Sequence, residues 1–258
     1  MPEFRHQGWR ISYKEYGEGD RPLVLVHGLL MNRRMFDRLA PEMVHYSMAF
    51  FAAQVVGLLD HLGLKRAVIG GTSLGANVTL TVAKDAPDRV KGMVVEMPVL
   101  DNALLAVGAI FTPILFGLRF GEPLLRPLAA VARRVPRQSF LVDILLDWIR
   151  QDPEPSAAVL EGLFLGAAAP HHSERMRMTQ PALVIGHHAD PLHPFSDSGM
   201  LAEELPNVRL IEASSILEWR LSPKRLNDEL ATFLDDVWSG RPVGEGRAEP
   251  EAALRESR

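Results

Sequence analysis

Residues 65–86, KRAVIGGTSLGANVTLTVAKDA, decide the fold of this 258-residue chain. The apolar run at 65–71 ends in two glycines and is typical of a strand buried on both faces of a parallel sheet. Helical periodicity over 74–86 begins only two residues later, after Thr72 and Ser73. The segment therefore predicts a strand, a tight turn and a helix in succession, with Ser73 at the turn.

The Gly-x-Ser-x-Gly pattern at this turn is typical of a serine nucleophile. Gly71 and Gly75 flank Ser73 at the positions where only small residues avoid clashes in a tight bend. The bend lifts the hydroxyl above the sheet and leaves the backbone N–H of Leu74 free at the start of the helix, where it can donate to an oxyanion. An ordinary glycine-rich turn is the alternative interpretation.

Apolar runs elsewhere predict further strands of the same sheet. They alternate with helical patterns, which favours a mainly parallel sheet flanked by helices, and ligands of such sheets bind at the carboxyl ends of the strands. The other predicted elements are strands at 9–16, 21–28, 90–100, 180–191 and 207–215, helices at 33–43 and 46–62, and a closing helix up to 238 with Ser222 as its N-cap and Pro223 in its first turn.

Residues 101–178 break this alternation. They contain apolar helical runs interrupted by prolines, and we predict a helical lid inserted into a core formed by residues 1–100 and 179–238. The stretch 103–118 has sixteen residues without a charge, fewer than the ~20 of a membrane span. Either the lid packs on the core with a solvated basic face, or it covers an apolar pocket and rests on anionic lipid.

Composition narrows the classes of partner and compartment. The chain has no cysteine, which excludes disulfides and thiolate metal sites, and its net charge of −4 argues against nucleic acid. The polar amino terminus has no apolar segment of a secretory signal, so we expect a cytoplasmic protein. The tail at 239–258 is predicted to be disordered, and nothing implies a cofactor or a metal.

Three segments resemble the α/β-hydrolase fold family, and the likeness extends over residues 9–238. LVLVHGLL (23–30) is similar to the His-Gly loop after the family's third strand, and GGTSLGAN (70–77) to its nucleophile elbow. ALVIGHHADPLHP (182–194) is similar to the strand and loop that carry the acid of the catalytic triad. The resemblance implies an α/β-hydrolase fold with a helical lid.

The resemblance also implies roles for individual residues. His27 and Gly28 would shape a loop in which the N–H of Leu29 is a second oxyanion donor beside Leu74, each such donor stabilising a tetrahedral intermediate by about 3 kcal/mol. Asp190 follows Ser73 in the Ser…Asp…His order of this fold and would orient an imidazole. A turn aspartate before a proline is the alternative interpretation of Asp190.

The sequence departs from the family at the catalytic base. The base is expected in the loop after the last strand, EASSILEWRLSP (212–223), yet no histidine follows His193. His193 is the candidate left for the base, with His187 and His188 as its rivals, because triads depend on geometry and not on chain order. Two other interpretations stay open. The three histidines and Asp190 could bind zinc, or the histidines could be exposed polar residues at the end of a strand.

A second departure is a shortage of chain. The segment APEMVHYSMAFF (40–51) runs from one predicted helix into the next, where the family places a strand and a loop. Parallel neighbours need a crossover of about a dozen residues or more, so the strand has no other place in the chain. Either the fold has lost an edge element or the gene product is shortened.

The sequence thus predicts a hydrolase that acts on a small or medium apolar ester or related acyl substrate. Ser73 would attack the carbonyl and form an acyl-enzyme. A serine nucleophile argues against epoxide or haloalkane hydrolysis, for which the fold uses an aspartate. The alternatives are a non-catalytic protein that binds an apolar small molecule, favoured by the missing imidazole, and a damaged descendant that folds poorly.

Overall fold

A computed structural model describes most of the chain. The described residues are 3–13, 23–26, 47–137, 140–165, 167–188, 190 and 192–243. The predicted helix at 33–43, the shortened segment before residue 47 and the loop residues His27, Gly28 and Leu29 lie outside this part.

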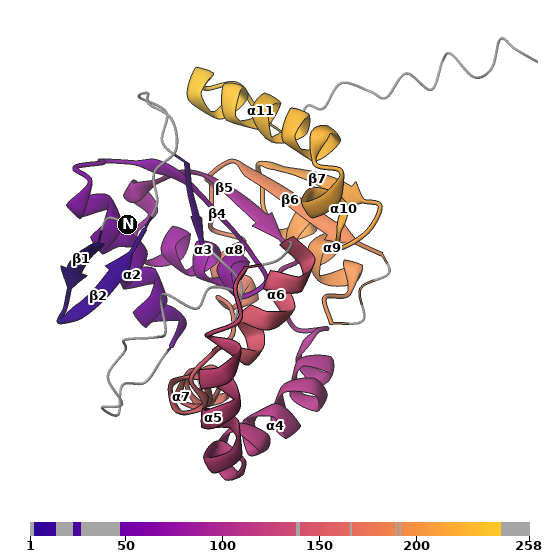
Figure 1. Cartoon of the computed structure of the whole chain (residues 1–258). Coiled ribbons are helices and arrows are strands. Elements are labelled where there is room, and N and C mark those ends of the chain that lie inside the picture. The colour runs from indigo at the N-terminus through magenta and orange to yellow at the C-terminus, as the bar shows by residue number, and fades with distance from the viewer. Residues whose placement is uncertain are drawn as a thin grey trace, which may run out of the picture.

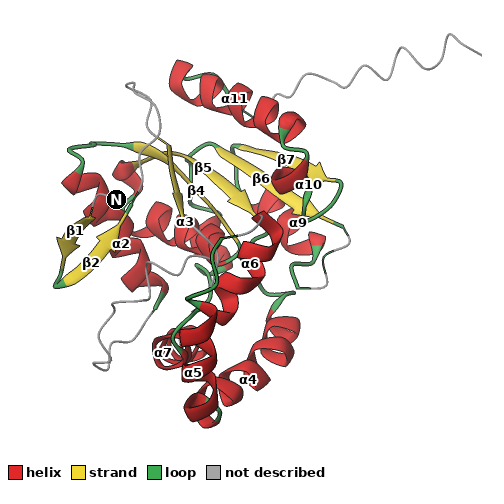
Figure 2. Ribbon diagram, in the orientation of Figure 1, coloured by secondary structure: helices red, strands yellow, loops and turns green. Residues whose placement is uncertain are grey.

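Among the described residues, five parallel strands form the central sheet, in the order β3-β4-β5-β6-β7 (Figure 2). Each strand pairs with the next along the chain, so the strands run in one direction and end at one edge of the sheet. This confirms the predicted parallel sheet flanked by helices. The strands are β3 (Leu23–Val26), β4 (Ala67–Thr72), β5 (Val90–Glu96), β6 (Ala182–His187) and β7 (Val208–Ala213).

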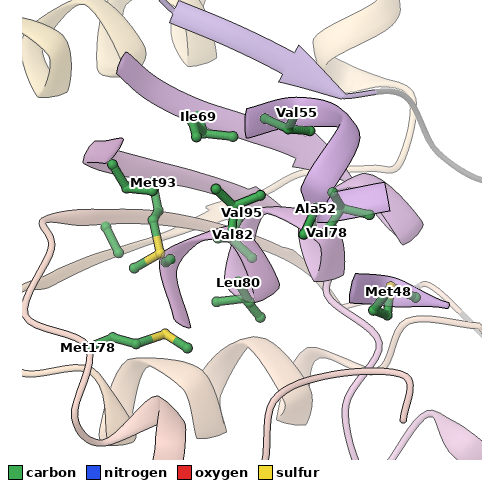
Figure 3. Close-up of a cluster of buried hydrophobic side chains, with 14 of the residues drawn as sticks. Met48, Ala52, Val55, Ile69, Val78, Leu80, Val82, Met93, Val95 and Met178 are labelled. Atoms are coloured by element: carbon green, nitrogen blue, oxygen red, sulfur yellow. The ribbon is translucent and has the colours of Figure 1, made fainter. Parts of the chain in front are cut away.

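Helices cover both faces of the sheet because side chains along the buried strands alternate between two apolar clusters. Ile69 and Met93 point into the larger cluster, where they meet α2 (Met48–His61) and α3 (Leu74–Asp85) (Figure 3). Their neighbours Val68 and Val94 point into the smaller cluster against α11 (Lys224–Ser239). The continuous apolar runs of the sequence reflect this burial on two sides.

The amino-terminal segment forms a separate antiparallel pair, β1 (Glu3–His6) and β2 (Trp9–Ser12). β2 corresponds to the start of the strand predicted at 9–16, whereas β1 was not predicted. The pair packs on α2, where Phe4 stacks on His61 at 4.5 Å between ring centroids. It does not fill the place beside β3, whose one neighbour among the described residues is β4.

Five helices make up most of residues 101–178, here called the helical insertion. In Figure 1, α4, α5 and α7 gather at the end of the molecule away from α11, whereas α8 lies beside α3. The carboxylate of the fully buried Asp197 accepts hydrogen bonds from the backbone N–H groups of Leu100, Asn102 and Ala103 at its start. The helices are α4 (Leu104–Phe120), α5 (Glu122–Ala132), α6 (Phe140–Ile149), α7 (Pro153–Leu165) and α8 (His172–Arg175).

The outer surface of α4 and α5 exposes large apolar side chains beside arginines that are paired with acidic residues. Phe116, Phe120 and Leu124 are 57%, 78% and 77% exposed, whereas Arg119 and Arg126 hydrogen-bond to acidic residues of α7. Within the described part of the chain no single helix is long and apolar enough to cross a membrane, although α4 and α5 together, bent by 94°, meet that test by length and composition.

The carboxyl-terminal helices differ in detail from the prediction. α9 (Phe195–Glu204) precedes β7, and a short helix, α10 (Glu218–Leu221), follows it. The prediction of Ser222 as the N-cap of α11 is wrong, because Ser222 follows the end of α10 and Pro223 occupies the N-cap position of α11. Part of the predicted disordered tail is ordered, since Val243 is 3% exposed and packs in the smaller cluster. Residues 244–258 lie outside the described part.

Candidate active site

Ser73 occupies a strained turn between β4 and α3. Its φ of 55° and ψ of −116° are unusual for a residue with a side chain and cost on the order of 1–3 kcal/mol. The Ser73 N–H donates to the carbonyl of Glu96 at 2.9 Å, and the Ser73 carbonyl accepts from the N–H of Asn77 at 3.1 Å. The turn is therefore tied to β5 on one side and to the first turn of α3 on the other.

The imidazole of His193 contacts the Ser73 hydroxyl. His193 Nε2 lies 2.8 Å from Ser73 Oγ, and His193 Nδ1 lies 2.8 Å from Asp190 Oδ2. With the proton on Nδ1, the ring donates to the carboxylate and accepts from the serine. The His193 and Asp190 side chains are 10% and 6% exposed, so water has little access to either hydrogen bond.

The carboxylate of Asp190 is held by backbone N–H groups of its own loop. Its Oδ1 accepts the backbone N–H of Leu192 at 2.8 Å and of His193 at 3.1 Å. Burial alone would raise the pKa of Asp190, but the hydrogen bonds and charge of His193 and the backbone donors outweigh burial and lower that pKa below its ordinary value. Asp190 is therefore poised to stay ionised beside the imidazole.

The other two candidate histidines point elsewhere. His187, at the end of β6, is 1% exposed and lies with Nε2 3.6 Å from Glu96 Oε1. His188 is exposed, stacks on Phe195 and pairs with Glu212 at 3.1 Å. Among the described residues no group of three histidine, aspartate or glutamate side chains converges as metal ligands, so the geometry does not favour the zinc interpretation.

Leu74 begins α3, which places its backbone N–H at a helix amino terminus next to Ser73. That is the position expected of one oxyanion donor. Gly71 lies in β4 and Gly75 in the first turn of α3, on either side of the serine as the motif predicts. Leu29, the other expected donor, lies outside the described residues.

A cavity of about 670 Å³ opens beside Ser73 and His193, between the sheet and the helical insertion. This volume lies within the range of small-molecule sites. Its wall is mostly apolar, and Lys84, Glu174 and Arg175 add polar atoms. The apolar lining comprises Met48, Ala49, Leu74, Val99, Leu100, Leu104, Val107, Phe111, Leu160, Leu163, Ala167, Ala168, Ala169, Pro170 and Leu192.

Asn77 fixes one wall of this cavity and was not singled out from the sequence. It is 1% exposed, and its amide nitrogen donates to the carbonyls of Val99 and Ala168 at 2.7 Å each. Its amide oxygen accepts the Val99 N–H at 2.9 Å. The signal in the sequence was a polar asparagine among the apolar residues of the predicted helix, one turn after Ser73. Its partners, Val99 and Ala168, are distant along the chain.

Behind Ser73, a second polar cluster joins the carboxyl ends of β4 and β5 to α10. The Glu96 carboxylate is 1% exposed and accepts hydrogen bonds from the Thr72 hydroxyl and from both terminal nitrogens of Arg220. Arg220 Nη2 also donates to Thr72 Oγ1 at 3.2 Å. Sequence reasoning missed this cluster, and none of these three residues lines the cavity.

Comparison with known proteins identifies the fold. A family model described as the α/β hydrolase fold matches residues 41–112. No curated protein matches the sequence.

Three solved structures illustrate the likeness in three dimensions. The enol-lactonase from Burkholderia xenovorans LB400 is 20% identical, with a TM-score of 0.70 over 91% of this chain and 100% of that one. An α/β-hydrolase enzyme from a Medee basin deep-sea metagenome library is 18% identical, with a TM-score of 0.68 over 97% and 100%. A thermophilic esterase from Thermogutta terrifontis is 20% identical, with a TM-score of 0.61 over 84% and 90%.

Proposed function

Since this chain has the α/β-hydrolase fold, we propose that it is a serine hydrolase of esters or related acyl compounds. The observation that carries the proposal is the 2.8 Å contact between His193 Nε2 and Ser73 Oγ beside an apolar cavity. The loop that holds Asp190 thus supplies the imidazole that the loop after β7 lacks. Hydrolases, an esterase and a lactonase among the similar structures support the reaction class.

In the acylation step, Ser73 Oγ attacks the carbonyl carbon of the substrate while His193 Nε2 takes the serine proton. Asp190 keeps Nδ1 protonated and stabilises the imidazolium that forms. The oxyanion of the tetrahedral intermediate accepts from the N–H of Leu74 and, by the family resemblance, of Leu29. Collapse breaks the bond to the leaving oxygen, which receives the proton from His193.

In the deacylation step, water replaces the leaving alcohol. His193 takes a proton from the water as its oxygen attacks the acyl carbon, and the same oxyanion donors hold the second intermediate. Collapse releases the acid and returns the proton to Ser73 Oγ. The two steps need no group beyond those already named, and we propose no cofactor.

The cavity supports an acyl group of small or medium size and apolar character. Val107 and Phe111 of α4 and Leu160 of α7 line it together with the serine, and apolar walls favour acyl chains over charged ones. The helical insertion would then act as a lid over the acyl group.

A non-catalytic protein that binds an apolar molecule is the rival proposal. It was favoured by the lack of a histidine in the loop after β7. The position of His193 supplies an imidazole from another loop and so favours the enzyme. The rival would share the cavity but would not need the Ser73–His193–Asp190 contacts.

Ester hydrolysis and active-site labelling test the proposal together. We expect the wild-type protein to hydrolyse p-nitrophenyl butyrate and to be labelled by a fluorophosphonate, and we expect Ser73→Ala to do neither. The control is Ser215→Ala, which changes a serine in the loop after β7 that does not line the cavity. Equal turnover by wild type and Ser73→Ala would overturn the proposed function.

A further inference from the structure

The cluster of Glu96, Arg220 and Thr72 has no part in the proton transfer proposed above, yet it lies directly behind the nucleophile. Thr72 is the last residue of β4 and the chain neighbour of Ser73. Glu96 is the last residue of β5 and is paired with Thr72 across the sheet. Burying an ionised carboxylate costs free energy unless the carboxylate is paired, so we looked for what Glu96 does at this point of the fold.

Glu96 contacts the elbow in two ways. Its backbone carbonyl accepts the N–H of Ser73 at 2.9 Å, and its carboxylate accepts the hydroxyl of Thr72. The same residue therefore holds two successive residues of the turn, one through the main chain and one through a side chain. The φ of 55° at Ser73 needs such support, because a strained backbone persists only where its surroundings fix it.

Arg220 fixes the Glu96 carboxylate in turn. Its two terminal nitrogens bind both carboxylate oxygens, with Nη2 2.7 Å from Oε2, and bidentate pairs of this kind fix direction as well as distance. Burial opposes ionisation of Glu96, but His187, Arg220 and Thr72 together lower its pKa below the ordinary value. Arg220 stands on α10, in the loop after β7 where the base was expected from the sequence.

We propose that Glu96 and Arg220 are positioning residues for the nucleophile. The ion pair of Glu96 and Arg220 acts through Thr72. It holds the strained turn so that Ser73 Oγ stays within hydrogen-bond distance of His193 Nε2. The loop after β7 thus contributes the guanidinium of Arg220, which fixes Glu96 and through it the turn that carries Ser73. This inference rests on the proposed role of Ser73, and it adds a function for two residues outside the triad.

Hydrogen–deuterium exchange and steady-state kinetics on three variants test the proposal. Glu96→Gln removes the charge but keeps the carbonyl that holds Ser73, Thr72→Val removes only the hydroxyl link, and Arg220→Ala removes the guanidinium. We expect exchange of the backbone amides at 73–77 to rise about tenfold or more in Glu96→Gln. We expect kcat to fall by about 10- to 100-fold, with KM within about twofold because the cluster does not line the cavity.

Chemical rescue separates positioning from general stability. The Arg220 side chain is 18% exposed, so a small cation can reach its place in Arg220→Ala. We expect millimolar guanidinium chloride to restore kcat in this variant, whereas sodium chloride at equal ionic strength does not. The matched control is Glu229→Gln, which breaks an ion pair with Arg209 between α11 and β7. It should leave kcat and elbow exchange unchanged.

The outcomes distinguish this inference from the proposed function. Unchanged elbow exchange and unchanged kcat in Glu96→Gln would overturn the inference, as would an equal loss in Glu229→Gln. If Glu96→Gln does not fold, Thr72→Val and the rescue of Arg220→Ala decide the matter. If wild type and Ser73→Ala turn over the ester equally, the proposed function fails, while the exchange measurement still tests whether the cluster holds the elbow.

Discussion

Ser73 and His193 are 120 residues apart in the chain, and their side chains meet at 2.8 Å. His193 and Asp190, by contrast, are three residues apart in one short loop and meet at the same distance. One contact of the site is therefore made by the tertiary fold and the other by local chain geometry. Different substitutions should disturb the two contacts.

His193→Gln tests the assignment of the base. The glutamine removes the imidazole that would take the Ser73 proton, and loss of a triad base lowers kcat by about 10⁴-fold or more. His188→Gln is the control, because His188 is exposed and pairs with Glu212 away from Ser73. Ester hydrolysis rates that are equal in His193→Gln and wild type would remove His193 from the mechanism.

Asp190→Asn tests the orientation of the imidazole. The amide keeps the shape of the side chain but loses the charge that holds Nδ1 protonated, so we expect kcat to fall by about 10³- to 10⁴-fold. Fluorophosphonate labelling of Ser73 should slow in parallel. Labelling at the wild-type rate would show that another group orients His193.

Gly186 should not tolerate a side chain. A Cβ at residue 186 would lie 2.7 Å from Ser198 Cβ and 2.8 Å from Phe195 Cδ2. Gly186→Ala must therefore displace α9, and overpacking of this kind lowers the free energy of unfolding by about 1–3 kcal/mol. Since α9 follows the loop of Asp190 and His193 directly, we expect kcat to fall as well.

Gly199→Ala is the matched control for that substitution. Gly199 lies on α9, the helix that a side chain at residue 186 would displace, and an added Cβ at residue 199 meets no atom within 4 Å. Replacing a helical glycine by alanine raises the free energy of unfolding by up to about 1 kcal/mol. Urea unfolding of the two variants should give opposite signs, and a similar loss in both would contradict the clash at residue 186.

Gly108→Leu should shorten the accepted acyl chain. Gly108 lines the cavity, and an added Cβ there meets no atom within 4 Å, so the leucine fills the cavity without a clash of its Cβ. We expect KM for a hexanoyl ester to rise about tenfold and KM for an acetyl ester to stay within about twofold. Gly117→Leu, on the same helix and away from the cavity, should change neither value.

The stability of α10 should depend on pH in the acid range. The Glu218 carboxylate is bound by Arg225 and by Ser214, which lowers the pKa of Glu218 from 4.5 to about 2, although burial opposes this. A lowered pKa in the folded state means that the stabilisation is complete above pH 4.5 and is lost as the pH falls towards 2. Urea unfolding at several pH values should show a smaller dependence over this range in Glu218→Gln than in wild type.

Substitutions in the exposed apolar surface of α4 and α5 test the lipid contact, which is one of the two alternatives that the sequence left open for the lid. Phe116 and Phe120 stack there at 5.8 Å, and the nearby Arg119 is already paired, so burial of apolar surface should dominate over charge. We expect sedimentation with phosphatidylcholine–phosphatidylglycerol vesicles to change little with salt and to fall in Phe116→Ser/Phe120→Ser. Met176→Ser, a change of similar exposure, is the control. Absence of sedimentation by wild type would exclude the lipid contact.

The sequence predicted the sheet and the elbow because their signals are local. Apolar runs mark β4, β5 and β6, since strands buried on both faces have no polar side, and two glycines mark the turn at Ser73. β1 was missed because its four residues, EFRH, carry one buried side chain among polar ones. A strand that short on a separate pair leaves little periodicity to detect.

The arrangement of the site was harder to predict because it depends on how short loops turn. His193 contacts Ser73 from a loop whose backbone donates two hydrogen bonds to Asp190, and residue spacing alone does not reveal these contacts. The contact between Arg220 and Glu96 joins residues 124 positions apart through a helix of four residues.

The placement of Asp190 and His193 within one loop has a consequence for motion at the site. Backbone hydrogen bonds from Leu192 and His193 fix the Asp190 carboxylate against the His193 imidazole, so we expect the two groups to move together. A displacement of this loop would change the distance to Ser73 while the carboxylate and the imidazole keep their contact. The distance that such a displacement would alter is the one between Ser73 Oγ and His193 Nε2, which is 2.8 Å here.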